Sequence, residues 1–215
     1  MTEIFDRKID FQATEDLIAN LAAQLSPEKK EIYDSLRIKE DRLRLITGDR
    51  LLREVLAAKY GKDPMEIRFI YGVHGKPALS DDESGIFFNL SHSGMYVAAA
   101  VSDKNVGIDI EQIKPLRDFI SVAEVFMSEL EYTYFKTLSG NQLSVYFYRL
   151  WSAKESFIKN TGNGIFEGLQ SVSIDLSAEP IRVYKNGKHL PEYMFKEIFI
   201  DPDYAGFVCI RENPA

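Results

Sequence analysis

Two short segments of the sequence carry charged side chains in patterns that could bind a metal ion and a phosphate. The segment Gly-Ile-Asp-Ile-Glu places the carboxylates of Asp109 and Glu111 two residues apart. The segment Trp-Ser-Ala-Lys-Glu-Ser-Phe-Ile-Lys contributes a third carboxylate, Glu155, four residues before Lys159. Residues two apart share one face of a strand, and residues four apart share one face of a helix. Brought together, these groups could hold a magnesium ion against a pyrophosphate.

Each pattern also has an ordinary explanation when it is read alone. An Asp-x-Glu pair is typical of the wet edge of a half-buried strand, and a Glu155–Lys159 pair is typical of a surface ion pair worth about 0.3–0.5 kcal/mol. If the carboxylates bind a metal ion, an all-oxygen donor set favours Mg²⁺, with Mn²⁺ as the alternative. Zinc is disfavoured, because the three histidines, His74, His92 and His189, lack ligand spacing.

Caps, periodicity and turn residues predict the elements that must position these side chains. Ser26 before Pro27 predicts the start of one helix, and recurring leucines predict another over residues 39–60, with Gly61 as its stop. Further helices are predicted at residues 117–138 and 141–159. Runs of β-branched and aromatic residues predict short strands at residues 67–71, 86–91, 96–101, 106–110, 172–176, 181–184, 197–200 and 206–211.

The predicted order of two helices followed by strands occurs twice along the chain. This repetition predicts an α+β fold of two similar halves related by a pseudo-two-fold axis, each with a small, mostly antiparallel sheet packed with helices. The predicted halves are residues 1–103 and 104–215, with the boundary in a turn-like stretch. In this arrangement both acidic segments belong to the second half.

Composition narrows the class of protein. The net charge of −7 and the pI near 5.1 argue against a nucleic-acid-binding protein, which needs clustered Lys and Arg. A hydrophobic content of 45% is ample for a packed core. The apolar runs are too short to span a membrane, and a single cysteine, Cys209, suits a reducing compartment. We therefore expect a cytoplasmic protein with no membrane and no nucleic-acid partner.

Groups that could contact an anion lie upstream of the acidic segments. Gly75 and Lys76 precede a proline in a loop where backbone and lysine could approach a ligand. Asn89, Ser91 and His92 form a cluster of small donors at the end of a predicted strand, a shape that can bind an anion. The ordinary alternatives are a solvated turn lysine and a hydrogen-bonded structural histidine. The least specific candidates are basic residues on predicted helices: Arg44, Lys29 and Lys30.

Taken in order, four segments resemble those of the surfactin-synthetase-activating type of 4′-phosphopantetheinyl transferase: Gly75-Lys-Pro77, Phe88-Asn-Leu-Ser-His-Ser93, Gly107-Ile-Asp-Ile-Glu111 and Trp151-x-x-Lys-Glu-Ser-Phe-Ile-Lys159. The resemblance covers roughly residues 26–165. It implies transfer of 4′-phosphopantetheine from coenzyme A to a serine of an apo carrier protein (acyl, peptidyl or aryl), with release of adenosine 3′,5′-bisphosphate. It also implies a monomer of two similar halves with coenzyme A in the cleft between them.

The resemblance further implies roles for individual residues. Asp109, Glu111 and Glu155 would be the magnesium ligands, and Asp109, Glu155 and Lys159 the catalytic residues. We hypothesise that Glu155, directly or through a metal-bound water, takes the serine proton while Lys159 stabilises or protonates the departing phosphate. The residues implied to bind coenzyme A are Arg44, Gly75, Lys76, Asn89, Ser91, His92 and, at the pyrophosphate, Lys159.

The sequence departs from the family's pattern where basic residues usually contact the 3′-phosphate. Ile32, Asp34 and Ser35 occupy a stretch that often carries further basic side chains, so the residues that bind this phosphate near Lys29 and Lys30 stay open. Tyr71 and His74 likewise replace frequent basic residues before the loop lysine.

The resemblance places carrier-protein docking in residues 114–126, which mix basic and apolar side chains. The alternative is a helix that buries its apolar residues within its own half. Two other functions stay open: a non-catalytic module that binds coenzyme A or a carrier protein, and a magnesium-dependent hydrolase. Retention of Asp109, Glu111, Glu155 and Lys159 together disfavours the binding module. Neither the carrier pathway nor the acceptance of acylated coenzyme A follows from the sequence.

Overall fold

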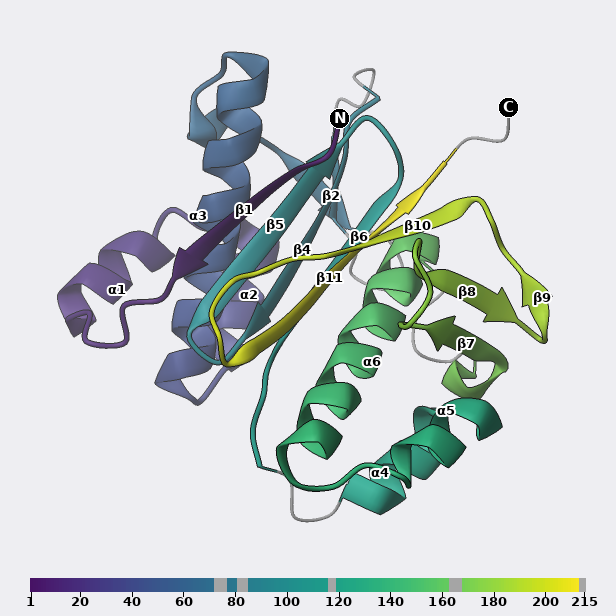
Figure 1. The fold of residues 1–215 in the computed structure, drawn as a ribbon. Helices are drawn as coiled ribbons and strands as arrows, with labels where there is room; N and C mark the ends of the chain where they lie inside the picture. The colour runs from purple at the N-terminus through teal and green to yellow at the C-terminus, as the bar shows by residue number, and fades with distance from the viewer. Residues whose placement is uncertain (72–76, 81–84, 116–118, 163–167, 213–215) are drawn as a thin grey trace.

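The computed structural model describes residues 1–71, 77–80, 85–115, 119–162 and 168–212 (Figure 1). Both halves of the chain follow one order of elements: a strand, helices, a small accessory sheet and two final strands. The first half contains β1 (Glu3–Lys8), α1 (Glu15–Ala22), α2 (Pro27–Ser35), α3 (Lys39–Tyr60), β2 (Phe69–Tyr71), β3 (Pro77–Leu79), β4 (Phe87–Ser93) and β5 (Tyr96–Ser102). The second contains β6 (Val106–Gln112), α4 (Phe119–Phe126), α5 (Glu129–Phe135), α6 (Gly140–Thr161), β7 (Val172–Asp175), β8 (Arg182–Lys185), β9 (Lys188–His189), β10 (Tyr193–Glu197) and β11 (Tyr204–Arg211).

The main sheets of the two halves have equivalent strand orders. The first is β1-β5-β4 and the second is β6-β11-β10, so in each the last strand of the half lies between the first and the penultimate. All pairings in both sheets are antiparallel. The predicted α+β fold of two similar halves is thus confirmed. The proposed division between residues 103 and 104 falls in the turn that connects β5 to β6.

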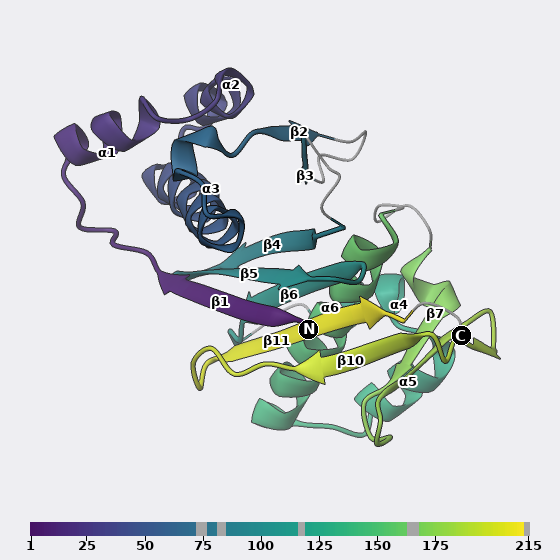
Figure 2. The ribbon, with the colours of Figure 1, turned by 90° about the horizontal axis from the view of Figure 1, so that it is seen from above.

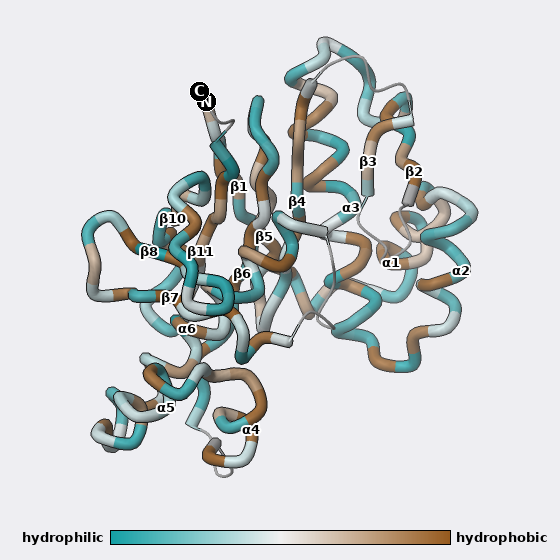
Figure 3. Tube along the Cα trace, turned by 90° about the vertical axis from the view of Figure 1, so that its right-hand side faces the viewer, coloured by the Kyte–Doolittle hydropathy of each residue, from teal (hydrophilic) through white to brown (hydrophobic). Residues whose placement is uncertain are grey.

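Each half has one long helix that packs on its sheet. Helices α3 and α6 both have 22 residues, and both end at a glycine in the left-handed region, Gly61 at φ 62° and Gly162 at φ 74°. Such a glycine stops a helix because it adopts positive φ without a steric penalty. The helices of the first half lie on one side of the strands and those of the second half on the other (Figures 2 and 3). The two main sheets therefore lie between the two sets of helices.

A third core joins the halves, in addition to one core within each half. Its buried members come from both halves. They are Ala98 and Ala100 of β5, Val106, Ile108 and Ile110 of β6, Val208 of β11, and Ile198, which directly follows β10. Because Ile108 and Ile110 are fully buried here, the alternate residues of β6 point to the opposite face. The core between the halves thus determines which way the acidic residues of β6 point.

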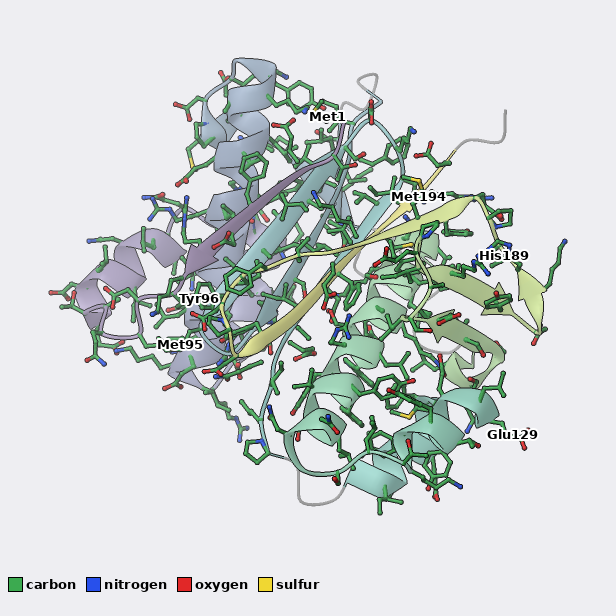
Figure 4. All side chains as sticks on the ribbon, in the orientation of Figure 1. Met1, Met95, Tyr96, Glu129, His189 and Met194 are labelled. Atoms are coloured by element: carbon green, nitrogen blue, oxygen red, sulfur yellow. The ribbon has the colours of Figure 1, made fainter. Side chains whose placement is uncertain are left out.

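The turn of the β4–β5 hairpin is held by the second half. Figure 4 shows Met95 and Tyr96 at this turn, beside the connection between β10 and β11. The Met95 N–H donates to the Tyr204 hydroxyl at 2.8 Å, and the Tyr96 hydroxyl donates to Asp201 at 3.1 Å. The end of β4 is consequently fixed relative to the second half.

Several predicted elements differ from the structure. Strand β1 and helix α1 were not predicted, because β1 is an edge strand with exposed charged residues and its alternation resembles a polar segment. The predicted helix 117–138 is divided: Ser128 accepts from the Glu131 N–H and the Glu131 carboxylate accepts from the Ser128 N–H, which caps a new helix, α5. The predicted strand 197–200 is wrong, since the strand there is β10, which ends at Glu197.

Candidate active site

Strand β6 presents two carboxylates toward helix α6. Asp109 is 3% exposed and Glu111 is half-buried, and both lie on the face opposite Ile108 and Ile110. Gly107 shares their face, and a Cβ atom there would lie 2.1 Å from the Ser156 carbonyl oxygen of α6. Only glycine permits this close approach of strand and helix, which brings α6 near the carboxylates.

Helix α6 contributes Ser152, Glu155 and Lys159, which lie three and four residues apart on one face. The Ser152 hydroxyl donates to the Asp109 carbonyl oxygen at 2.8 Å, and the Lys159 ammonium donates to Asp109 Oδ1 at 2.7 Å. The next residue is Asn160, whose Nδ2 donates to the carbonyl oxygens of Asn105 and Cys209 at 2.8 and 2.9 Å. These bonds hold the helix in register with β6, so that Glu155 and the acids of β6 share one site.

The three carboxylates interact electrostatically. Burial, then the negative charges of Asp109 and Glu111, raises the pKa of Glu155 to about 7, although Lys159 opposes the shift. Burial and the charge of Asp109 also raise the pKa of Glu111, against hydrogen bonds from Ser93 and the Trp151 side chain. The arrangement concentrates negative charge among largely buried groups, which favours a cation.

Two carboxylate oxygens in this site are buried without a hydrogen-bond partner, Asp109 Oδ2 and Glu155 Oε1. Buried carboxylate oxygens are nearly always paired, so these two oxygens are positions at which a cation could bind. In the described part of the chain, however, no three His, Cys, Asp or Glu side chains are placed together as a ready metal-binding group. The ammonium of Lys159 instead contacts Asp109. The chemistry of the donors fits a hard cation such as Mg²⁺, and the contact of Lys159 with Asp109 Oδ1 leaves Asp109 Oδ2 for such an ion.

The predicted coenzyme A residues lie in two different environments. The Asn89 and Ser91 side chains are 5% and 4% exposed and bond to β6, between the halves. His92 is exposed at the end of β4, where partial desolvation and the positive charges of Lys159 and Arg44 lower its pKa. Arg44 Nε donates to the Gly94 carbonyl oxygen at 3.0 Å. Arg44, His92 and Lys159 therefore form a basic group beside the carboxylates.

Two of the predicted residues, Gly75 and Lys76, lie outside the described residues, so their positions stay a prediction. Lys154, which directly precedes Glu155 in the same segment, does not belong to the site. Lys154 is 1% exposed and its ammonium contacts the Glu131 carboxylate at 2.6 Å, on another side of the helix. Consecutive helix residues project about 100° apart, so Lys154 and Glu155 have different partners.

The sequence analysis missed three polar residues that contact the site. They are Ser93 and Trp151, which bond to the Glu111 carboxylate, and Ser152, which bonds to the backbone of Asp109. A signal for Ser93 existed, because Asn89, Ser91 and Ser93 alternate along one strand and share a face. No sequence pattern distinguishes Ser152 from a serine that simply packs in a helix.

The raised pKa of Glu155 predicts that the metal-free protein loses stability as the pH rises. The unfolded chain has the ordinary value of 4.5, so below that pH the carboxyl is protonated in both states and carries no penalty. Between 4.5 and about 7 the unfolded state releases its proton first, and the folded state loses about 3 kcal/mol relative to it. In EDTA, Glu155→Gln should therefore gain stability over the unmodified protein at pH 8 but not at pH 4.5, measured by urea unfolding. Equal differences at the two pH values would contradict this.

The fold and the site together are typical of enzymes that transfer a phosphorylated group with the help of a divalent cation. Two family models match the chain: 4′-phosphopantetheinyl transferase, N-terminal, over residues 10–104, and the 4′-phosphopantetheinyl transferase superfamily over residues 105–209. The chain is 38% identical to the 4′-phosphopantetheinyl transferase Sfp of Bacillus subtilis (strain 168) over 186 residues, which cover 86% of this chain and 81% of that protein.

Two other relatives match over more of the chain. The 4′-phosphopantetheinyl transferase psf-1 of Bacillus pumilus is 36% identical over 92% of this chain and 84% of its own length. The 4′-phosphopantetheinyl transferase HetI of Nostoc sp. is 34% identical over 94% of this chain and 85% of its own length. The chain belongs to the 4′-phosphopantetheinyl transferase family, which confirms the resemblance seen in its four motifs. It is an enzyme whose activity is transfer of the phosphopantetheine group to carrier proteins.

Proposed function

We propose that the enzyme takes the 4′-phosphopantetheine group from coenzyme A, depends on Mg²⁺, and releases adenosine 3′,5′-bisphosphate after transfer to a serine of an apo carrier protein. The observation that supports this most is the pair of buried, unpartnered oxygens, Asp109 Oδ2 and Glu155 Oε1, beside the ammonium of Lys159. Two acids with free oxygens suit a cation, and an adjacent lysine suits a phosphate. His92 and Arg44 would contact the adenosine and 3′-phosphate end, together with Lys76.

The residues divide the chemistry between them. When bound, Mg²⁺ would be held by Asp109, Glu111 and Glu155 and would neutralise charge on the pyrophosphate. Glu155 takes the proton of the carrier serine. The serine oxygen forms a bond to the β-phosphorus of coenzyme A, and the bond from that phosphorus to the bridging oxygen breaks. Lys159 stabilises or protonates that departing oxygen.

A direct test separates transfer from the two other functions. The protein is incubated with Mg²⁺, coenzyme A and an apo carrier protein, and the mass of the carrier is measured. We expect the carrier to gain one phosphopantetheine group and adenosine 3′,5′-bisphosphate to appear in equal amount. An unchanged carrier would support a binding module, and free phosphopantetheine would support a hydrolase. Omitting Mg²⁺ and adding EDTA tests the cation requirement in the same assay, and a panel of apo carriers tests the choice of partner.

We propose that the carrier docks against the region of Lys114 and α4. Lys114 is exposed, as are the α4 side chains Ile120 and Val125, at 63% and 73%. Exposed apolar residues next to a basic group suit an acidic partner with an apolar contact surface. The other basic residue predicted for docking, Arg117, lies outside the described residues.

Reversing the charge of Lys114 should weaken docking more than it weakens coenzyme A binding. We expect Lys114→Glu to raise the KM for an acidic carrier about tenfold, since like charges across an interface are unfavourable, and to leave the KM for coenzyme A unchanged. Lys8→Glu, on the exposed face of β1 in the first half, controls for the change in net charge. Equal increases in both KM values, or an equal effect of Lys8→Glu, would argue against docking at this surface.

None of the described helices is long and apolar enough to cross a membrane. We propose that the enzyme acts in the cytoplasm, as a monomer in which the two halves form one site. The single cysteine of the sequence, Cys209, is buried, which is compatible with a reducing compartment. Both halves contribute side chains to the site, since Ser91 and Arg44 come from the first and Asp109 and Glu155 from the second.

A further inference from the structure

Strands β4 and β6 are joined by side chains instead of backbone pairing. The two strands belong to different sheets, yet alternate β6 amides donate to alternate β4 side chains. The Ile108 N–H donates to Asn89 Oδ1 at 3.0 Å and the Ile110 N–H to Ser91 Oγ at 3.3 Å. The Gln112 N–H donates to Ser93 Oγ at 3.1 Å. We call Asn89, Ser91 and Ser93 the side-chain ladder, and it is where the first half meets the acidic strand of the second.

Each of the two serines of the side-chain ladder also donates a hydrogen bond to an acid of β6. Ser91 Oγ donates to Asp109 Oδ1 at 2.9 Å, and Ser93 Oγ donates to Glu111 Oε2 at 2.7 Å. Each hydroxyl therefore accepts a hydrogen bond from one β6 amide. It donates its only hydrogen to the carboxylate of the β6 residue just before that amide. A geometry that recurs two residues later, on both acids of the strand, is unlike a chance surface contact.

The hydrogen-bonding capacity of Ser91 is fully used by these contacts. Its oxygen has two acceptor positions, and the Ile110 N–H and the Lys159 ammonium, at 3.0 Å, occupy both. Its hydrogen is given to Asp109. The Ser91 side chain is thus engaged with β6 and α6 in this arrangement, and its predicted contact with coenzyme A stays a prediction.

We propose that Ser91 and Ser93 are positioning residues: their hydroxyls hold Asp109 and Glu111 so that each acid keeps an oxygen lone pair free to bind a divalent cation. This inference rests on the proposed metal-binding role of the acids. For Asp109 the structure already has this form, with Oδ1 bonded to Ser91 and Lys159 and Oδ2 buried without a partner. Side chains that orient metal ligands typically change metal affinity by 10- to 100-fold when they are removed.

The test measures binding of Mn²⁺ to the full chain, by the electron paramagnetic resonance signal of the free ion, with saturating coenzyme A. We expect Ser93→Ala and Ser91→Ala each to weaken Mn²⁺ binding about tenfold or more, and Ser93→Thr, which keeps the hydroxyl, to restore most of the affinity. Either alanine variant alone is sufficient, so the test stands if one of them folds poorly.

Ser102→Ala is the matched control. Ser102 is a fully buried serine at the far end of the β4–β5 hairpin, bonded to Thr2 and to the Lys104 N–H, so its removal costs a buried hydroxyl without touching the acids. Its Mn²⁺ affinity should equal that of the unmodified protein. Unchanged Mn²⁺ binding in both alanine variants, or an equal loss in Ser102→Ala, would overturn the positioning role while leaving the metal site in place. Failure of the unmodified protein to bind Mn²⁺ would instead overturn the metal site itself, and the inference with it.

Discussion

Replacing Glu155 by glutamine should lower turnover about 10³-fold or more while coenzyme A binding is largely kept. Glutamine has nearly the same shape, but it carries no charge to hold a cation and cannot accept the serine proton. Removing one general base typically costs about 10²–10⁴-fold, and the loss of a metal ligand adds to this. In the metal-free protein, burial and the charges of Asp109 and Glu111 raise the pKa of Glu155 to about 7, so its carboxylate lies in a different environment from that of an ordinary surface acid.

Turnover is measured by the mass of the carrier product, and coenzyme A affinity by calorimetry. Glu15→Gln serves as the control, since Glu15 is an exposed residue of α1. Near-normal turnover of Glu155→Gln would contradict both the base and the ligand assignments. A parallel loss of turnover and coenzyme A affinity would mean that Glu155 acts mainly in binding.

That Asp109 and Glu111 point to the same face could be predicted, because alternate residues of a strand share a face. Once residues 106–110 are recognised as a strand with Ile108 and Ile110 in a core, Asp109 and Glu111 must share the other face. Their approach to Glu155 was not predictable from periodicity, because it depends on how β6 packs against α6. Gly107 is the residue that decides this, and in the sequence it appears only as the first letter of a motif.

Lys154 and Ser93 illustrate what local patterns leave out. Both have partners more than ten residues away in the sequence, Glu131 for Lys154 and Glu111 for Ser93. A lysine in a helix is usually exposed, so burial of Lys154 could be inferred only from the fold.

The sequence predicted the two similar halves and their long helices well, but it predicted the edge strand β1 and the accessory strands less well. The two long helices, 39–60 and 140–161, have strong stop signals and were located within two residues. The edge strand β1 was missed because Glu3, Asp6, Arg7 and Lys8 make four of its six residues charged, so it lacks a hydrophobic run. The small accessory strands were predicted in part, but β9, with two residues, is too short to have a pattern.

Replacing the buried Lys154 by methionine should destabilise the protein by about 3–5 kcal/mol, a large fraction of the stability of an ordinary domain. The Lys154 ammonium contacts Glu131 and donates to the carbonyl oxygens of Phe126 at 2.8 Å and Leu169 at 3.0 Å. Glu131, 5% exposed, also accepts from the Ile174 N–H at 2.7 Å. Methionine fills the volume but leaves the Glu131 carboxylate buried without a counter-charge, and two carbonyl oxygens without their donor.

Urea unfolding at pH 7 measures this loss, and two variants make its cause explicit. Lys136→Met removes an exposed lysine of the same half and should change stability by less than about 0.5 kcal/mol. Lys154→Met combined with Glu131→Gln should recover part of the loss, because the pair then leaves no uncompensated charge. If Lys154 instead served the reaction, Lys154→Met would lower turnover with stability unchanged. The structure predicts the reverse, since the lysine connects α4, α5 and the turn before β7 to the helix that carries Glu155, and does not itself face the carboxylates.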